Sequence, residues 1–563
     1  MAVLSKIGLG ELESRSGREK ATFFFLIFMS VFLFMDQNLT GPNLSAIGED
    51  LIIKRSAVEE ELARSNAEYR SIRQELEAKR SSIHEFQTRI EGMRLSILKH
   101  NPLLEKKPAE LIAAVSAEAE KTWSAPEIEV FAQAARLQDK LNVKVTEEFN
   151  KYCDRIAGHA SLWFWLLGGT VAILVGYLTD KFPRKILLFI TIIIGEVPCL
   201  LTGYAKTESE FIFLRALTGI GIGAVLPLTY SLLGDLFSAK ARSSAVAWIG
   251  LAQGIGIAGG QLLAGFMGPN PDFTWRFPFI AVAVPNFVLA FLFLFLSREP
   301  GRGSSEHEFQ AALESGGEYE ERIKFGDLKK IFTNRTNVLV FLQGIPGTVP
   351  WGFFFAYLPD FYHSNKGYTV EDATLLITIF GGGAILGGFI GGIIGNWLYN
   401  KKPSYLPMLC AATTLIGIIP ILVVVNWSSS DISPLATSLH YLGGLHITQF
   451  SDLLFPILCG FFGGAIVTVT GANVKAVLID VNVPENRGTI FSFFNLSDDL
   501  GKGLGPFIIG IILVQAFGRV IAYNIAILMW IFCGAIWIIL VRVFPADELK
   551  LHAVLKERAA RIK

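Results

Sequence analysis

The stretch from Gly176 to Lys185 reads Gly-Tyr-Leu-Thr-Asp-Lys-Phe-Pro-Arg-Lys and joins two long apolar segments. It sets a small residue, Gly176, four positions before the carboxylate of Asp180, and the cations Arg184 and Lys185 follow. A glycine lets two helices approach closely within a membrane, and cations in a short loop tend to stay on the cytoplasmic side. The stretch therefore predicts a tight turn between two membrane-spanning helices.

Apolar segments long enough to span a bilayer, about 20 residues each, occur twelve times along the chain. Six precede a polar stretch at 297–336 and six follow it: 21–40, 161–178, 186–204, 211–228, 244–267, 277–296, 337–358, 373–398, 405–425, 453–477, 489–516 and 521–541. The 563 residues are 51% hydrophobic and 18% charged, whereas a soluble domain carries about 25% charged residues. We predict an all-α membrane protein with twelve transmembrane helices.

The charge balance and the cysteine pattern exclude several classes of protein. The chain carries 50 basic and 50 acidic residues, so its net charge gives no argument for nucleic-acid binding. Its five cysteines show no Cys-x-x-Cys spacing and no cluster with histidine, which argues against a zinc site or a disulfide framework. A Walker loop is absent, and so is a nucleophile with its base at recognisable spacing. We expect no enzyme, no metal and no cofactor.

The Lys and Arg content of the short loops predicts the orientation of the helices. With the N-terminus inside, most cations fall on the cytoplasmic side, and the opposite short loops hold only Lys206, Arg276, Lys366 and Arg519. We therefore expect both termini in the cytoplasm. The first segment lacks an Ala-x-Ala cleavage site, so we expect a retained helix, and the lack of an organelle signal fits a bacterial inner membrane.

The two sets of six spans resemble one another in sequence. Residues of the first half recur about 245 positions later, as Asp235, Arg242, Gly256, Gly260 and Gly265 correspond to Asp480, Arg487, Gly501, Gly505 and Gly510. Parallel repeats of this kind are typical of a large class of secondary transporters. We expect two six-helix pseudo-repeats, divided as follows: tail and first span 1–50, insertion 51–155, spans two to six 156–296, cytoplasmic linker 297–336, spans seven to twelve 337–542 and cytoplasmic tail 543–563.

The first half carries about 100 residues more than the second, and this surplus coincides with a highly charged stretch at 51–155. Its apolar residues recur every three, four or seven positions from 62 to 97, as in a coiled coil. Prolines at 102 and 108 end that helix, and a capping box of Ser124 and Glu127 opens another that runs to about Tyr152. We expect an extracytoplasmic helical insertion, either a stalk or cap, or a coiled coil that binds a partner or a second copy.

With these features the chain resembles the major facilitator superfamily, in which the stretch from Gly176 to Lys185 corresponds to the loop between the second and third helices. The resemblance implies a two-lobed secondary transporter in which this loop is a conformational latch. The gating residues it implies are Gly176, Asp180, Arg184, Lys185, Asp235, Arg242, Asp480 and Arg487.

Within the superfamily, the run from Leu214 to Gly221, the Gly-Asp-Leu-Phe at 234–237 and the Glu-Pro-Gly-Arg-Gly at 299–303 are similar to the Spinster family. That family resemblance implies a carrier of lysophospholipids or sphingoid lipids. The chain departs from the Spinster pattern at Gln37 and Ile222, where the family has an arginine and a glutamate.

Charged residues inside membrane spans are costly, about 2.5 to 3.5 kcal/mol each on insertion scales, and mark functional sites by default. Asp36 and Arg215 both fall in the outer halves of their spans and can pair. We predict that Asp36 takes up a proton during transport, because the neighbouring guanidinium favours the ionised carboxylate and its departure releases that hold. A static ion pair that braces two helices is the alternative, and Glu196 in the third span is a further candidate.

A second group of charges lies near the middle of the eleventh span. Asp498 and Lys502 are one turn apart and are expected to pair, which leaves Asp499 either facing a cavity or in a structural role. Lys475 in the tenth span is expected to bind an anionic headgroup or to extend to the membrane surface. The candidate site for proton coupling and substrate therefore comprises Asp36, Arg215, Asp498, Asp499, Lys502 and Lys475.

The function predicted from the sequence is proton-coupled transport of a lysophospholipid or another amphipathic lipid by alternating access. A small organic anion or a drug is the alternative substrate. A transporter-like receptor or scaffold that acts through the insertion is an alternative of another class, and its activity would survive the loss of Asp36. The expected partners are the substrate, protons, membrane lipids and, through the insertion, a protein or a second copy of the chain.

Overall fold

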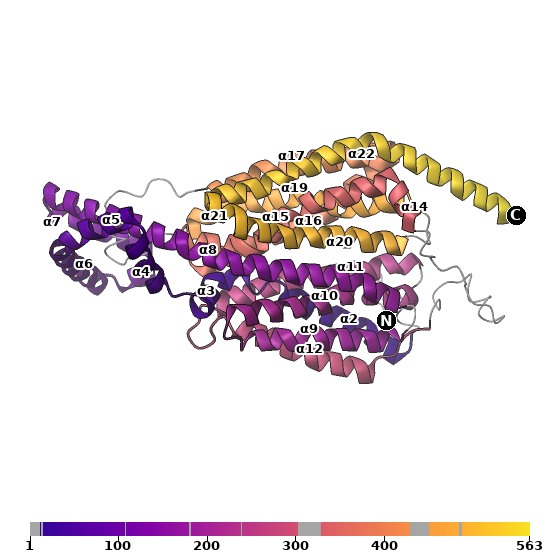
Figure 1. The fold of residues 1–563 in the computed structure, drawn as a ribbon, viewed down its shortest axis with the longest axis horizontal. Coiled ribbons are helices and arrows are strands. Elements are labelled where there is room, and N and C mark those ends of the chain that lie inside the picture. Colours follow the sequence, from indigo (N-terminus) through magenta and orange to yellow (C-terminus); the bar gives the residue numbers. More distant parts are fainter. Residues whose placement is uncertain are drawn as a thin grey trace.

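The computed structural model describes residues 12, 15–106, 108–179, 182–237, 239–301, 328–427, 450–482 and 487–562. All regular structure in these residues is helical, and twelve of the helices are long and apolar enough to cross a membrane. Figure 1 shows these helices side by side, with shorter helices projecting beyond one end of the bundle. We call this the insertion end, and we call the opposite end, where the chain ends N and C lie, the terminal end.

The first six spanning helices form the N-lobe: α2 (Gly17–Asp36), α8 (Ala125–Leu178), α9 (Arg184–Thr202), α10 (Glu208–Leu236), α11 (Ala239–Met267) and α12 (Phe277–Leu296). The first of them begins with a capping box, in which Ser16 and Glu19 satisfy each other's backbone N–H groups. Within the lobe α10 packs between α8 and α9, and α2 packs against α11 and α12. The lobe interior is a continuous apolar core around Phe23, Leu188 and Phe293.

The other six form the C-lobe: α15 (Arg335–Ser364), α16 (Val370–Lys401), α17 (Tyr405–Asn426), α19 (Leu454–Ile479), α20 (Arg487–Ile508) and α22 (Arg519–Ile562). A π-helical turn, η7 (Ile509–Leu513), and the short α21 (Val514–Phe517) extend α20 to the insertion end. The short α14 (Leu328–Thr333) precedes α15, and η5 (Phe450–Leu453) precedes α19. The bundle therefore has the twelve helices in two sets of six that the sequence predicts.

After α2 the chain continues as η2 (Gly41–Asn43) and α3 (Leu44–Leu51), which belong to the first span of the N-lobe. The insertion then contains α4 (Arg55–Ser65), α5 (Ala67–Ala78), α6 (Arg80–His100), η3 (Pro102–Lys106) and α7 (Pro108–Thr122). It has a small core of its own, in which the rings of Phe86, Trp123 and Phe131 lie 5.0 to 5.3 Å apart. Two interruptions, at Asn66 and Lys79, divide the predicted long helix into three. Its apolar residues are used in two separate cores, so the predicted coiled coil is not supported.

The helix that begins after the predicted capping box is longer than the sequence indicates. The backbone N–H and the hydroxyl of Ser124 both donate hydrogen bonds to Glu127 Oε2, each at 2.7 Å. The helix does not end near Tyr152, however, but continues through the membrane span to Leu178, and this helix, α8, is 54 residues long in all. After Pro126 in its first turn the helix contains no proline or glycine before Gly158, so the insertion and the second span share one rigid element.

The two lobes meet along α8 and α20, and α11 meets α16. A Cβ added at Gly510 would overlap the carbonyl oxygen of Asp154, and one at Gly158 would lie 3.0 Å from the carbonyl oxygen of Pro506. Near the terminal end of α8, a Cβ added at Gly176 would meet no atom within 4 Å. The lobes are thus in close contact at the insertion end, as expected when a transporter is closed on that side.

Candidate functional site

Asp36 and Arg215 face each other inside the N-lobe. Asp36 is the last residue of α2, and Arg215 lies two turns into α10. One guanidinium nitrogen lies 2.5 Å from Asp36 Oδ1, and another donates to the Asp36 carbonyl oxygen at 3.1 Å. The side chains are only 1% and 4% exposed. The structure therefore brings together the pair that the sequence singled out.

The surroundings of the pair are mostly apolar. The rings of Phe164 and Phe279 cover the guanidinium carbon of Arg215 at 4.9 and 5.5 Å from their centroids. The Cys199 thiol donates to Asp36 Oδ1 at 3.1 Å, whereas Asp36 Oδ2 has no hydrogen-bond partner among the described residues. A buried polar oxygen without a hydrogen-bond partner is unfavourable, so the Asp36 carboxyl group is only partly satisfied by its neighbours.

Glu196 of α9 adds a second buried carboxyl group to this region. Its side chain is 1% exposed, and Asn286 of α12 donates to Oε1 at 2.6 Å. Oε2 has no hydrogen-bond partner within the described part of the chain. Glu196 interacts electrostatically with both Asp36 and Arg215. Two buried carboxyl groups, one paired with Arg215 and one within its electrostatic range, therefore lie in this region of the N-lobe.

The charges in the middle of α20 pair differently from the prediction. Lys502 Nζ donates to Asp499 Oδ1 at 3.2 Å, so the predicted pairing of Lys502 with Asp498 is wrong. The reason lies in the neighbouring helices: Asp499 and Lys502 face α8, where the Cβ of Asp499 lies next to Gly169. The carboxylate of Asp498 turns instead toward α15 and lies next to Gly344.

These charges are partly exposed although they lie in a membrane-spanning helix. The side chain of Lys502 is 30% exposed and that of Asp499 16% exposed. Lys475 of α19 is exposed too, and it interacts electrostatically with Asp498 and Lys502. Charged groups at this depth normally face a water-filled or ligand-filled space and avoid lipid. We therefore regard these four residues as one group, the α20 charge cluster.

Two consecutive residues of α8 connect the charged regions of the two lobes. Phe164 covers Arg215 within the N-lobe. The ring of Trp165 lies 4.7 Å from Lys502 Nζ in the C-lobe. A cation over an aromatic face is stabilised by the ring quadrupole, so α8 has an attractive contact with a cation on each side. The α20 charge cluster consequently lies at the junction of the lobes.

A buried ionic network that the sequence analysis missed joins the lobes at the insertion end. Arg519, the first residue of α22, lies 2.6 Å from Asp154 of α8 and 2.8 Å from Asp360 of α15, and the three side chains are at most 3% exposed. Asp360 also accepts hydrogen bonds from the backbone N–H and the hydroxyl of Ser45 at 2.9 and 2.5 Å. We call these four residues the Arg519 network. It ties α3 and α8 to the C-lobe.

From the sequence alone, Arg519 falls in a short loop and Asp154 in the insertion. Nothing in the local sequence relates positions 154, 360 and 519, which only the fold brings together. A possible signal was the parallel with Arg276, which stands just before the sixth span as Arg519 stands at the start of the twelfth. Gly518, at a φ of 79°, makes the turn that places Arg519 in the network.

Three of the predicted gating residues come together at the terminal end of the N-lobe. Arg184, whose side chain is 3% exposed, forms ion pairs with Asp235 of α10 and, at 2.9 Å, with Glu299 after α12. The Lys185 Nζ donates to the carbonyl oxygen of Ser297 at 2.8 Å. The start of α9 is thus fixed to the ends of α10 and α12.

The remaining predicted gating residues are less informative. Gly176 lies near the end of α8, and Asp480 follows α19, where its side chain interacts with Tyr399. Asp180 and the side chains of Arg242 and Arg487 lie outside the described residues. Among the residues that are described, no three His, Cys, Asp or Glu side chains are placed to hold a metal ion.

Two six-helix lobes with buried ion pairs, joined at one end of the bundle, define an integral multi-pass membrane protein of the transporter class. The family model described as Major Facilitator Superfamily matches residues 132–451, which is more than half of the chain. The chain belongs to this superfamily and is a membrane transporter.

Individual relatives agree with the Spinster resemblance. The chain is 26% identical to "Protein spinster" of Drosophila melanogaster over 345 residues, which are 60% of this chain and 52% of that protein. It is 23% identical to "Sphingosine-1-phosphate transporter SPNS2" of Danio rerio over 352 residues, 60% of this chain and 64% of that protein. The matched part thus spans about half to two thirds of these relatives.

A solved structure confirms the fold. A bacterial homolog of the human lysosomal transporter Spinster, in an inward-facing and unoccupied conformation, superposes with a TM-score of 0.56 at 17% identity, covering 76% of this chain and 99% of that one. The family and its structural relatives are transporters and not enzymes, as the sequence predicts.

Proposed function

We propose that the chain is a secondary active transporter that works by alternating access, is driven by protons and carries a lysophospholipid or a related amphipathic lipid. The observation that carries this proposal is the α20 charge cluster. It combines cations and carboxylates, remains partly exposed inside the bundle and lies against Trp165 of the other lobe. A site shared by the two lobes is what alternating access requires.

The composition of the cluster suits a lipid with both a phosphate and an amine. Lys502 and Lys475 offer donors to a phosphate, while Asp498 and Asp499 offer acceptors to an ammonium group. The zebrafish relative is named for sphingosine-1-phosphate, a single-chain lipid that carries these two groups. The neighbouring indole of Trp165 gives the apolar part of such a molecule a surface to contact.

Proton coupling is proposed for the buried carboxyl groups of the N-lobe. Asp36 and Glu196 each have an oxygen without a partner among the described residues, and they share the charge of Arg215. Two ionised carboxylates beside one guanidinium would leave a buried negative charge unpaired, so the cluster is suited to bind and release one proton. The resulting movement of Arg215 would reach the α20 charge cluster through Phe164 and Trp165.

The gates are proposed at opposite ends of the bundle. The Arg519 network closes the insertion end, and it must separate for the lobes to open there. The contacts of Arg184 with Asp235 and Glu299 belong to the latch at the terminal end. We place the insertion outside the cytoplasm, and the termini and the 297–336 linker in the cytoplasm, and we propose a bacterial inner membrane. The N-lobe comprises the first span and 156–296, and the C-lobe comprises 337–542.

The test is flux of labelled lysophospholipid in proteoliposomes with an imposed pH gradient. The native chain should show gradient-dependent flux, and Asp36→Asn should lose the dependence on the gradient. The matched control is Asp50→Asn, which removes a carboxylate that pairs with Arg276 near the surface. No lipid flux by a correctly folded native chain would refute the lipid assignment, and gradient-dependent flux in Asp36→Asn would refute the coupling role.

A small organic anion is the second candidate substrate, and the proximity of Lys475 to Lys502 favours it. Two neighbouring cations can bind a compact anion that has no acyl chain. Competition of such anions with the labelled lipid in the same proteoliposomes distinguishes the two. A receptor or scaffold function through the insertion would leave both fluxes absent, with the binding of a protein or a second copy unaffected by Asp36→Asn.

A further inference from the structure

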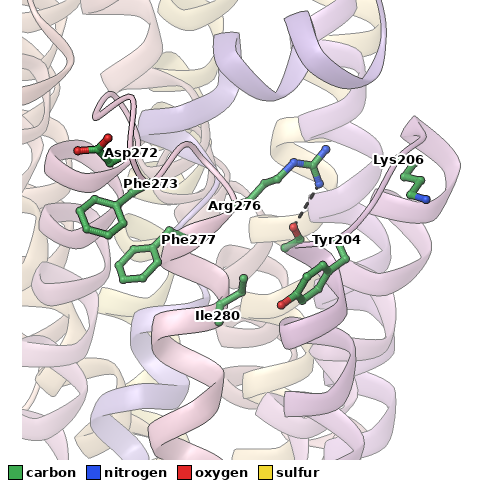
Figure 2. A pocket seen from close by; sticks show the side chains of 8 residues that line it. Tyr204, Lys206, Asp272, Phe273, Arg276, Phe277 and Ile280 are labelled. Atoms are coloured by element: carbon green, nitrogen blue, oxygen red, sulfur yellow. Dashed lines mark hydrogen bonds between the residues drawn. The ribbon is translucent and has the colours of Figure 1, made fainter.

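A pocket of about 410 Å³ lies on the flank of the N-lobe, at the insertion end, where α9 ends and α12 begins. It is separate from the α20 charge cluster, because its lining residues all belong to the N-lobe, whereas the cluster belongs to α19 and α20 of the C-lobe. In Figure 1, α9 and α12 lie along the edge of the bundle opposite α17 and α22. Figure 2 shows Ile280 between Phe277 and Tyr204, with Phe273 beside Phe277. The rings of Phe273 and Phe277 are 4.5 Å apart. The pocket therefore has an aromatic lining.

The back of the pocket is fixed by Arg276. Its guanidinium donates to the carbonyl oxygens of Gly203 and Ala205 at 3.2 and 2.6 Å, and it forms an ion pair with Asp50 at 2.8 Å. These bonds hold the α9–α10 loop against the start of α12. Since its donors are largely used within the protein, Arg276 shapes the pocket and leaves recognition of a ligand to other residues.

Two charged residues of opposite sign remain available at the rim. Lys206 and Asp272 lie on opposite sides of the pocket (Figure 2). Both are exposed, and neither side chain forms an ion pair within the described part of the chain. A carboxylate next to paired aromatic rings is a suitable site for an ammonium group, and a lysine is suited to a phosphate. The pocket thus offers separate positions for a cation and an anion.

The helices below the pocket present apolar side chains to their surroundings. Exposed residues recur with identical spacing on the two helices, at Ile190, Ile194, Val197 and Leu201 on α9 and at Val284, Val288, Phe291 and Phe295 on α12. The spacing of four, three and four places each set on one helix face. Both faces lead to the pocket, which is lined by Gly203 and Tyr204 just after the end of α9 and by Phe277 and Ile280 in the first turns of α12. Acyl chains lying on these faces would bring a headgroup to the pocket.

We infer that this pocket binds the headgroup of a zwitterionic membrane phospholipid from the leaflet at the insertion end. The phosphate contacts Lys206, the ammonium group contacts Asp272 and the rings of Phe273 and Phe277, and the acyl chains lie along α9 and α12. The site is separate from the proposed substrate site, and it binds lipid whether or not the lipid is transported. The aromatic residues lie where such side chains commonly mark the membrane surface.

The test is native mass spectrometry of the full chain from nanodiscs containing equal amounts of phosphatidylethanolamine and phosphatidylglycerol with the same acyl chains. The native chain should retain phosphatidylethanolamine about tenfold over phosphatidylglycerol. Asp272→Lys replaces the carboxylate by a cation and should reverse this preference. Phe273→Ala should weaken retention severalfold, whereas Phe517→Ala, which removes an exposed phenylalanine from the C-lobe at the same end, should leave it unchanged.

All of these positions are exposed, so the variants should fold, and their melting temperatures confirm it. Equal retention of the two lipids by the native chain would overturn the proposal, and so would an unchanged preference in Asp272→Lys. Displacement of the lipid by glycerophosphoethanolamine at an equal concentration would show that the ligand is a free solute and not a membrane lipid. Failure of lipid flux in proteoliposomes would not affect any of these outcomes, because this measurement requires no transport.

Discussion

Replacing Arg519 by glutamine should shift the protein from the state that is closed at the insertion end toward the state that is open there. Arg519 is the sole cation of its network, and the substitution leaves Asp154 and Asp360 buried and near one another without a counter-charge. Asp154 belongs to α8 of the N-lobe and Asp360 to α15 of the C-lobe, so the repulsion acts across the boundary between the lobes.

The size of the shift follows from the burial of the network. Removing one partner of a buried ion pair costs about 3 to 5 kcal/mol. This cost falls on the closed state, because both carboxylates become hydrated when the lobes separate. At about 1.4 kcal/mol per tenfold change, the ratio of closed to open protein should fall about a hundredfold to a few thousandfold. A closed state favoured by a few kcal/mol would no longer dominate.

Spin-label distances between the lobes measure this ratio. Phe213 at the start of α10 and Leu454 at the start of α19 lie at the insertion end and are 62% and 58% exposed. Both can be replaced by labelled cysteines in a Cys459→Ser background, since the other four native cysteines are buried. The native chain should give a dominant short distance, and Arg519→Gln should give a dominant long one.

Two controls separate this reasoning from simple damage to the fold. Adding Asp154→Asn and Asp360→Asn to Arg519→Gln removes the uncompensated charges and should restore the short distance. Arg276→Gln, which removes a cation that pairs within the N-lobe, should leave the distance unchanged. An unaltered distance in a folded Arg519→Gln variant would show that the network does not hold the lobes together, and the reasoning would be wrong.

Three further changes test other parts of the structure. Asp499→Asn removes the partner of a partly exposed lysine, so the free energy of unfolding should change by less than about 1 kcal/mol. The apparent affinity for substrate, measured from the rise in melting temperature as substrate is added, should fall about tenfold. Gly518→Ala should destabilise the protein by about 1 to 3 kcal/mol in thermal unfolding, because a φ of 79° is strained for alanine. Gly92→Ala is the control and should be neutral or stabilising, because an added Cβ in the middle of α6 meets no atom within 4 Å. Ser124→Ala should cost about 1 kcal/mol at the start of α8, seen as faster amide exchange in its first turn.

The fold could be predicted from the sequence because its determinants are local or repeated. Each span is a predominantly apolar segment of sufficient length, and the repeat from Asp235 to Gly510 relates the two halves without any knowledge of contacts. The insertion was harder to predict, since the same apolar spacing serves a coiled coil and a small folded bundle equally well. Only the breaks at Asn66 and Lys79 distinguish them, and neither residue is a strong helix breaker.

Charge pairing was predicted only where few choices existed. Asp36 and Arg215 are isolated in their spans, so each was the natural partner of the other. Along α20 the alternatives Asp498 and Asp499 lie four and three residues from Lys502, and both spacings permit an ion pair. The choice depends on which neighbouring helix each carboxylate faces, and no rule of spacing within a single helix contains that information.

The structure gives α8 a role that neither its sequence nor its length alone would suggest. It begins in the insertion, passes Asp154 in the Arg519 network, and then presents Phe164 to Arg215 and Trp165 to Lys502. Ten residues of helix separate Asp154 from Phe164, about 15 Å along a single axis. The Asp36–Arg215 pair lies within one lobe, whereas the Arg519 network joins the two lobes and must break when they separate. Because α8 contacts both, it can link the proposed protonation of the N-lobe carboxyl groups directly to opening at the insertion end.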